Sequence, residues 1–123
     1  MKELTKAEEQ IMQIIWDIKQ GFVKDILDKI EEPKPAYNTV STIVRILEKK
    51  KFVGYKAYGK THEYFPLVAK EDYRNELMGN VVKNYFSNSF QQLVSFFATD
   101  KQLSLKELEE VRVLLDEEIS KQK

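Results

Sequence analysis

The segment YNTVSTIVRILEKKK, residues 37–51, has the residue pattern of a helix with two unlike faces. At 3.6 residues per turn, its apolar side chains fall on one side, which can pack on a core: Val40, Ile43, Val44 and Leu47. The other side carries short hydrogen-bonding groups around one arginine: Asn38, Ser41, Thr42, Arg45 and Lys49. Short polar side chains let a backbone approach a surface closely, and arginine can bind guanine or phosphate. An ordinary solvated helix is the alternative, although such a face more often mixes Glu with Lys.

The preceding residues predict two more helices and a break, which complete a helix-turn-helix pattern. Thr5 and Glu8 can form a capping box, so a helix is expected to begin there. Gly21 is expected to end that helix by adopting a left-handed conformation. A second helix follows, and Pro33 and Pro35 stop it before the polar-faced helix begins. A helix, a break and a polar-faced helix in this order are typical of DNA-binding helix-turn-helix units.

After Lys51 the pattern changes from helical to extended, which predicts a β-hairpin. Residues 52–58 are rich in aromatic and β-favouring residues, Gly59 and Lys60 can form a turn, and residues 61–65 run back until Pro66 ends the strand. A hairpin directly after a helix-turn-helix is the wing of a winged helix. Its tip carries a positive charge and can reach a phosphate or a minor groove. The strand aromatics are interpreted as strand formers, and no metal-binding or general-base role is predicted for His62.

Composition limits the functions open to this chain of 123 residues. It has no cysteine and one histidine, which excludes disulfides, thiolate metal sites, cysteine nucleophiles and His-rich metal sites within one chain. It shows no glycine-rich phosphate loop and no nucleophile–base pair, so we expect no enzyme activity, no cofactor and no bound metal. No apolar run approaches the roughly 20 residues needed to cross a bilayer, and the charged N-terminus is unlike a signal peptide. We therefore expect a cytoplasmic protein without membrane insertion.

The net charge is zero, but the charge is unevenly distributed along the chain. Residues 34–66 contain seven basic and two acidic residues, a net charge of +5, whereas residues 67–123 have a net charge of −2. Positive charge is thus concentrated around the polar-faced helix and the hairpin, as expected for a surface that contacts phosphates. A winged-helix module that binds proteins without DNA is the alternative, and both this charge and the acid-poor helix face argue against it.

The C-terminal part of the chain predicts helices that need a partner. A helix is expected over residues 69–86, a short apolar piece over 93–97, and a last helix that begins at a capping box of Ser104 and Glu107. Because the winged helix closes on itself, the aromatic residues beyond it need another surface, and the economical one is the same segment of a second subunit. The expected fold is mostly α-helical with a small hairpin wing. Residues 1–68 are assigned to a DNA-binding domain and residues 69–123 to a helical dimerisation region.

Five motifs, spread over nearly the whole chain, occur in the order and spacing of one protein family. They are Ala7-Glu8…Ile11-Met12…Ile14-Ile15-Trp16, Thr39-Val40-x-Thr42, Leu47-x-Lys49-Lys50-x-Phe52, Tyr64-Phe65-x-Leu67-Val68 and Leu103-Ser104…Glu109-Glu110-Val111-Arg112. On these motifs the chain resembles the penicillinase-repressor family. Its members are bacterial winged-helix repressors of β-lactam-resistance genes, with a copper-responsive branch.

The resemblance implies a homodimer that binds double-stranded DNA, with a palindromic operator as the expected target. In the family the third helix lies in the major groove and the wing touches the backbone, so Thr39, Ser41 and Thr42 fall on the base-contacting turn. Together with the polar helix face, this gives the predicted base-contacting residues Asn38, Thr39, Ser41, Thr42 and Arg45. The predicted backbone-contacting residues are Lys49, Lys50, Lys56, Tyr58 and Lys60. The predicted dimerisation residues are Tyr73, Leu77, Val81, Tyr85, Phe90, Leu93, Phe97, Leu108, Val111 and Leu115.

The resemblance also implies a membrane sensor that responds to β-lactam, after which the repressor is cleaved in its C-terminal region near an Asn-Phe pair. Here the corresponding pair is Phe96-Phe97, two apolar residues that are expected to be buried. Lys51 stands where many members have Gly, so the third helix must be capped differently. Ser41 stands where some members have a longer side chain, so no operator sequence can be carried over. The copper branch uses C-terminal cysteines, which this chain lacks.

Overall fold

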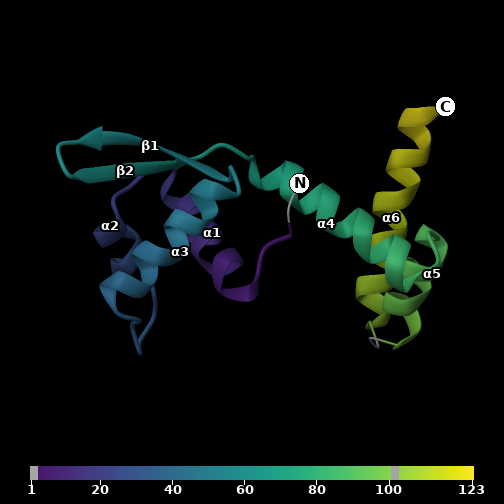
Figure 1. Cartoon of the computed structure of the whole chain (residues 1–123). Coiled ribbons are helices and arrows are strands. Elements are labelled where there is room, and N and C mark those ends of the chain that lie inside the picture. Colours follow the sequence, from purple (N-terminus) through teal and green to yellow (C-terminus); the bar gives the residue numbers. More distant parts are fainter. Residues whose placement is uncertain (1–2, 101–102) are drawn as a thin grey trace. The chain divides into compact units, whose positions relative to one another are not determined.

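The computed structural model describes residues 3–100 and 103–123 and is mostly helical, with one two-stranded hairpin (Figure 1). The elements are α1 Lys6–Ile18, α2 Val23–Asp28, α3 Tyr37–Lys49, β1 Val53–Tyr58, β2 Thr61–Pro66, α4 Lys70–Tyr85, α5 Phe90–Ser95, the π-helix η1 Phe96–Asp100 and α6 Leu105–Gln122. They confirm the predicted fold class. The chain divides into two compact units, a first unit Met1–Glu76 and a second unit Leu77–Lys123. Within the described residues, no helix combines the length and apolar content that crossing a bilayer requires.

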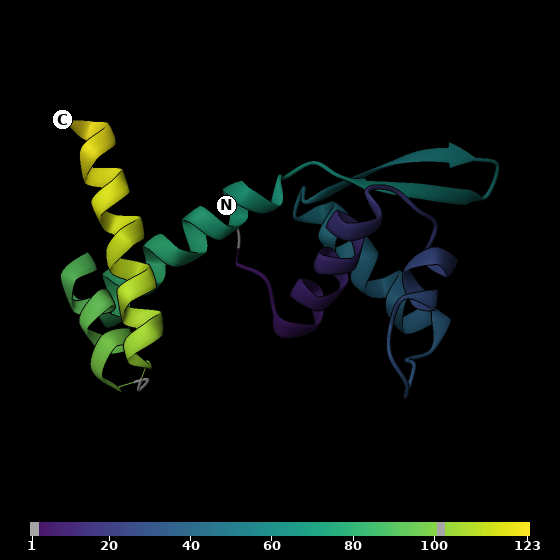
Figure 2. The same cartoon turned by 180° about the vertical axis from the view of Figure 1, so that it is seen from behind.

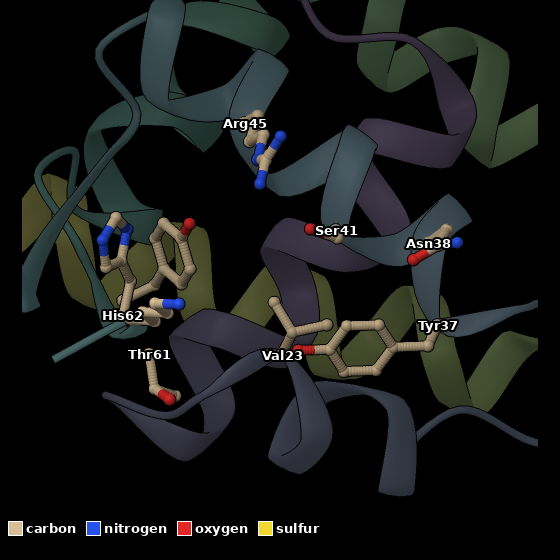
Figure 3. A pocket seen from close by; sticks show the side chains of 9 residues that line it. Val23, Tyr37, Asn38, Ser41, Arg45, Thr61 and His62 are labelled. Carbon is tan, nitrogen blue, oxygen red and sulfur yellow. The ribbon is translucent and has the colours of Figure 1, made fainter. Parts of the chain in front are cut away.

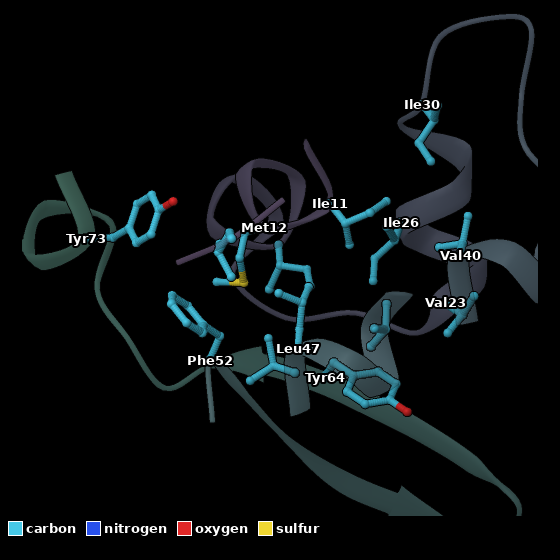
Figure 4. Close-up of a cluster of buried hydrophobic side chains, with 14 residues drawn as sticks. Ile11, Met12, Val23, Ile26, Ile30, Val40, Leu47, Phe52, Tyr64 and Tyr73 are labelled. Atoms are coloured by element: carbon cyan, nitrogen blue, oxygen red, sulfur yellow. The ribbon is translucent and has the colours of Figure 1, made fainter. Parts of the chain in front are cut away.

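The core of the first unit lies between its three N-terminal helices and the hairpin (Figure 4). Val40, Val44 and Leu47 are fully buried, which confirms the apolar side predicted for residues 37–51. They share one cluster with buried residues of the other elements: Ile11, Met12, Ile15, Val23, Ile26, Phe52, Val53 and Tyr64. Burying a large apolar side chain stabilises a fold by about 1.5–3 kcal/mol. The buried face therefore fixes the orientation of α3 and leaves its polar face outside.

The first helix begins at the predicted capping box but ends differently from the prediction. Lys19, rather than Gly21, has a positive φ, 72° with ψ of −37°, so the helix does not end in a left-handed helical residue. Gly21 instead forms two backbone hydrogen bonds with Tyr64 of β2, of 2.9 and 2.7 Å. A Cβ atom at this position would lie 2.7 Å from Cδ1 of Ile18. The predicted role of Gly21 is therefore wrong: the glycine forms a backbone bridge to β2, and the space of a Cβ atom is taken by Ile18 of α1 and Asp25 of α2.

The C-terminal end of α3 is capped by a lysine in the conformation that usually takes glycine. Lys51 has φ of 66°, and the next amide, of Phe52, donates to the carbonyl of Leu47 at 2.9 Å. A left-handed residue other than glycine costs roughly 1–2 kcal/mol. The side chain of Phe52 is 1% exposed, and its burial offsets that cost. The departure from the family pattern at Lys51 is thus accommodated by the residue that follows it.

The hairpin matches the prediction in both strands and in its turn. β1 and β2 pair in antiparallel fashion, with Tyr55 opposite Tyr64 and Tyr58 opposite Thr61. Gly59 in the turn has φ of 64°, and no atom would lie within 4 Å of an added Cβ. The glycine is therefore used for its backbone conformation and not for close packing.

The first turns of α4 belong to the first unit. Tyr73 is 7% exposed, with the rings of Trp16 and Phe52 each 5.7 Å from its own, and its hydroxyl donates to Glu9 at 3.1 Å. Burial, together with the hydrogen bond to Glu9, raises the pKa of Tyr73 to about 12. The Trp16 indole also donates to the carbonyl of Val68 at 2.8 Å. Tyr73 therefore lies in the core of its own chain, which does not fit its predicted role in dimerisation.

The second unit consists of the end of α4 together with α5, η1 and α6. In two opposite views α5 and α6 lie side by side (Figure 1, Figure 2). The predicted capping box of Ser104 and Glu107 begins α6. Val82 is 1% exposed, and the Phe96 ring lies 5.6 Å from that of Phe86. Many large apolar side chains nevertheless remain exposed: Tyr85, Phe90, Val94, Leu105, Val113, Leu114 and Ile119.

Candidate nucleic-acid interface

The polar face of α3 carries the predicted base-contacting residues. All of them are exposed or half-buried: Asn38, Thr39, Ser41, Thr42 and Arg45. The Thr42 hydroxyl donates to the carbonyl of Asn38 at 2.9 Å, which holds the threonine side chain against its own helix. Glu48 is the single acidic residue of α3. The face is therefore accessible and almost free of negative charge, and contact of these residues with bases stays a prediction.

A hollow of about 230 Å³ lies beside this face, between α3, the hairpin and the start of α2 (Figure 3). Its lining residues are Val23, Tyr37, Asn38, Ser41, Arg45, Lys60, Thr61, His62 and Tyr64. The lining contains two permanent cations, Arg45 and Lys60, and no Asp or Glu. The structure thus brings three of the predicted base-contacting residues together with the predicted backbone-contacting lysine of the turn.

The remaining predicted backbone-contacting residues of the hairpin and of α3 lie outside the hollow. Lys56 is exposed, and its Nζ lies 5.3 Å from the centre of the Tyr58 ring, a cation–π arrangement. Tyr58 is 49% exposed and packs edge-on against Phe22 at 5.8 Å. Lys49 is exposed at the last turn of α3. These positions are open to a neighbouring molecule, and their contact with a DNA backbone stays a prediction.

The charged end of Lys50 binds groups of its own chain. Its Nζ forms an ion pair with Glu8 and also donates to the carbonyl of Glu3 at 3.2 Å. Glu8 is 6% exposed. Burial alone raises the pKa of the Glu8 carboxyl, but hydrogen bonds from Lys50 and from the Thr5 amide outweigh it and hold the pKa below its ordinary value. Because this lysine serves a buried carboxylate, the structure does not support its predicted contact with phosphate.

The predicted dimerisation residues other than Tyr73 lie in the second unit. The exposed ones are Leu77, Tyr85, Phe90, Phe97, Val111 and Leu115, and the half-buried ones are Val81, Leu93 and Leu108. Both phenylalanines of the predicted cleavage position lie in η1. Phe96 is half-buried, but Phe97 is 44% exposed, which corrects the expectation that both are buried.

Several residues that line the hollow were not predicted from the sequence, above all His62. Tyr64 is buried against the core, and because side chains alternate along a strand, His62 lies on the same face of β2 as Tyr64. The alternation is visible in the sequence, but it does not show that α3 lies opposite His62. Among residues 3–100 and 103–123, no three His, Asp or Glu side chains gather closely enough to hold a metal ion.

The family model and the curated relatives that match this chain point to one family. Residues 4–117 match the model of a family described as penicillinase repressor. The methicillin resistance regulatory protein MecI of Staphylococcus aureus is 30% identical over 115 residues, which cover 93% of this chain and 94% of that protein. The penicillinase repressor of Staphylococcus aureus is 28% identical, covering 94% and 92%. A solved CopR repressor structure is 28% identical and covers 55% of this chain and 99% of its own, with a TM-score of 0.46. The resemblance is confirmed: the chain belongs to the penicillinase-repressor family, whose members are transcriptional repressors and not enzymes.

Proposed function

We propose that the chain is a dimeric, sequence-specific transcriptional repressor that binds a palindromic operator in double-stranded DNA. The observation that carries the proposal is one hollow that joins an acid-poor helix face to a basic hairpin turn. A recognition helix must present hydrogen-bonding groups to base edges while nearby cations hold the backbone, and α3 and the turn supply both. The names of the relatives, which are repressors and regulators of resistance, support the same role.

In this proposal α3 enters the major groove and the hairpin lies along the backbone. The first turns of α3 supply amide and hydroxyl groups that can donate to and accept from base edges: Asn38, Thr39 and Ser41. The Thr42 hydroxyl, which donates to the Asn38 carbonyl, can accept from a base. Arg45 follows one turn later, beside the hairpin turn. The backbone contacts come from Lys49, Lys56, Tyr58 and Lys60. Lys50 is left out of this set because of its ion pair with Glu8.

The proposed dimer is supported by the exposed apolar side chains of the second unit. Tyr85, Phe90 and Leu105 are 79%, 70% and 72% exposed. Each such side chain would contribute about 1.5–3 kcal/mol if a second chain buried it fully. Two copies of the same segment can cover each other through a symmetric interface. The two winged-helix units of such a dimer bind two half-sites more tightly than one unit binds one half-site, because the first contact raises the effective concentration of the second unit.

We place the target among β-lactam-resistance operons or related stress operons, and the repressor in the cytoplasm, where bacterial operators lie. The relatives named for methicillin resistance and for penicillinase support this assignment. Inactivation follows from a membrane sensor protease that cuts between Phe96 and Phe97. Such a cut removes α6 from the dimerisation region, so release from DNA follows from dissociation without a change in α3. The 44% exposure of Phe97 supports this cut position.

The proposed function is tested by selecting binding sites for the full chain from a pool of random DNA duplexes. A palindromic winning site, together with sedimentation of the full chain as a dimer at micromolar concentration, is the expected result. A monomer, or a pool without enrichment, contradicts the proposal. The alternative is a winged helix that binds proteins only. The dependence of duplex affinity on salt separates the two, because phosphate contacts release counterions and give a steep slope.

A further inference from the structure

The hollow between α3 and the hairpin holds positive charge from two different elements. Arg45 comes from α3 and Lys60 from the turn, with His62 close by on β2 (Figure 3). Within the described ranges 3–100 and 103–123, neither Arg45 nor Lys60 takes part in an ion pair. Both charges therefore remain available to a ligand. Two cations that converge from separate elements favour an anion whose oxygens point in several directions.

The rest of the lining supplies neutral hydrogen-bond donors and no competing carboxylate. The donors are the side chains of Tyr37, Asn38, Ser41 and Thr61. Two acids lie on the same elements without lining the hollow: Glu48 of α3 still acts electrostatically on Tyr64, and Glu63 stands opposite Lys56 on the other face of β2. The lining therefore suits an oxyanion with several acceptor atoms better than it suits a cation.

The imidazole of His62 is held in place by two aromatic rings. It stacks on Tyr55 with ring centres 4.1 Å apart and planes 9° apart, and the Tyr64 ring lies edge-on at 6.1 Å. An imidazole is neutral in alkaline solution and cationic in acid. The other titratable groups around it are Arg45 and Tyr37 on α3, Lys60 in the turn, and the two tyrosines. Side chains of those types do not ordinarily change charge between about pH 5.5 and 8.

We infer that this hollow is a binding site for one phosphate group, called here the phosphate seat, in which Arg45, Lys60 and the protonated form of His62 hold the phosphate. The inference rests on the proposed DNA-binding function and deepens it, because the phosphate is one of the operator backbone. It also changes the predicted role of Arg45 from a base contact to a backbone contact. A phosphate seated between α3 and the turn fixes the angle at which α3 enters the groove. Protonation of one histidine then tunes the affinity for DNA.

Base contact and phosphate contact by Arg45 predict different binding patterns. The affinity of the full chain is measured for the selected operator and for a duplex of unrelated sequence, over a series of salt concentrations. Arg45→Ala should weaken both complexes by the same factor, about ten- to a hundredfold. It should also make the slope of log affinity against log salt shallower by about one. A loss confined to the operator, with unchanged binding to the unrelated duplex, overturns the phosphate seat.

The contribution of His62 is isolated by pH, because it is the one histidine of the chain. At constant salt, the affinity of the unchanged protein should be higher in acidic than in alkaline solution, because only a protonated imidazole is a cation. His62→Gln should remove this dependence. Lys56→Ala is the matched control, because it removes a cation from the same hairpin outside the hollow, and it should keep the dependence. An equal pH dependence in the unchanged protein and in His62→Gln overturns the role of His62.

The NMR signals of the His62 ring distinguish binding of free phosphate from binding of a phosphate in the DNA backbone. At fixed pH and ionic strength, inorganic phosphate and the duplex should each shift these signals, and Arg45→Ala should reduce both shifts. A response to inorganic phosphate alone overturns the backbone assignment, and no response to either overturns the seat. Thermal unfolding checks that each variant is folded. Absence of any duplex binding contradicts the proposed function, whereas duplex binding with unmoved His62 signals contradicts only the seat.

Discussion

Replacing Lys50 should destabilise the first unit rather than remove a DNA contact. Lys50→Met takes away the cation that partners Glu8, where the end of α3 meets the start of α1. Glu8 is 6% exposed, and the Lys50 side chain is 22% exposed. Removing one partner of a fully buried pair costs about 3–5 kcal/mol, because the other charge is left uncompensated. The partial exposure of Lys50 and the hydrogen bond that the Thr5 amide still donates to Glu8 reduce the expected loss to about 2 kcal/mol.

Glu8→Gln is the matched variant for a double-mutant cycle. It keeps an acceptor for the Thr5 amide but loses the charge, so its expected cost is about 1 kcal/mol. Once residue 8 is neutral, Lys50→Met leaves no charge stranded, and the double variant should lose about 1–2 kcal/mol less than the two single losses together. Chemical denaturation followed by the fluorescence of Trp16, the one tryptophan, measures all four proteins. Strictly additive losses would refute the coupling between the two side chains.

The same pair gives the free energy of unfolding a defined dependence on pH. The folded-state pKa of Glu8 lies below its ordinary value of 4.5, so the folded chain binds fewer protons than the unfolded chain in this range. The stabilisation is therefore fully present above the unfolded pKa and is lost as the pH falls through the folded pKa. Glu8→Gln should show a smaller loss of stability over that acid range. Under native conditions, an unchanged salt slope for duplex binding by Lys50→Met would confirm that Lys50 makes no phosphate contact.

Three further changes test other parts of the chain. Gly21→Ala should cost about 1 kcal/mol in chemical denaturation, because the Ile18 Cδ1 atom 2.7 Å from the new Cβ can move away while Asp25 Cβ, 3.2 Å away, must give by a few tenths of an ångström; a gain in stability would contradict this crowding. A fragment ending at Glu76 should sediment as a monomer and bind DNA weakly, and one ending at Val68 should be less stable by about 3 kcal/mol because it lacks Tyr73. Incubation with the sensor protease should give products cut between residues 96 and 97 by mass spectrometry, whereas induction with an intact chain would rule out this mechanism.

Most of the fold could be predicted because local signals agree with one another at each element. The two capping boxes begin α1 and α6 at the expected residues. The apolar spacing of residues 37–51 fixes the face of α3 that is buried, so the polar face follows without further information. The hairpin was recognisable because Gly59 stands between two runs of β-favouring residues. In each case the decisive residues are neighbours in sequence.

The errors fall where contacts between distant segments decide the conformation. Lys51 takes a left-handed conformation because Phe52 enters the core, and no rule of local propensity predicts a lysine there. Tyr73 was assigned to a dimer because the pattern of α4 does not show which of its turns packs on Trp16. His62 was missed because its importance depends on what α3 places opposite β2. Each of these positions needs the packing of two elements, which the sequence pattern of one element does not contain.

The number of phosphate contacts that this surface can make depends on which basic side chains remain free of ion pairs, and not on the total count of basic residues. Of the seven in residues 34–66, Lys50 pairs with Glu8, whereas Lys56 lies over the Tyr58 ring but is exposed and keeps its charge. Lys34 donates to three carbonyls at the end of α2, a structural use of its charge: those of Leu27, Asp28 and Ile30. In the part of the chain that the structure describes, the others form no ion pair: Arg45, Lys49, Lys51 and Lys60. Four of the seven are proposed to contact phosphates: Arg45, Lys49, Lys56 and Lys60. At roughly 0.9 counterions released per phosphate contact, they give a salt slope of about 3.6 for each subunit, against about 6 for all seven.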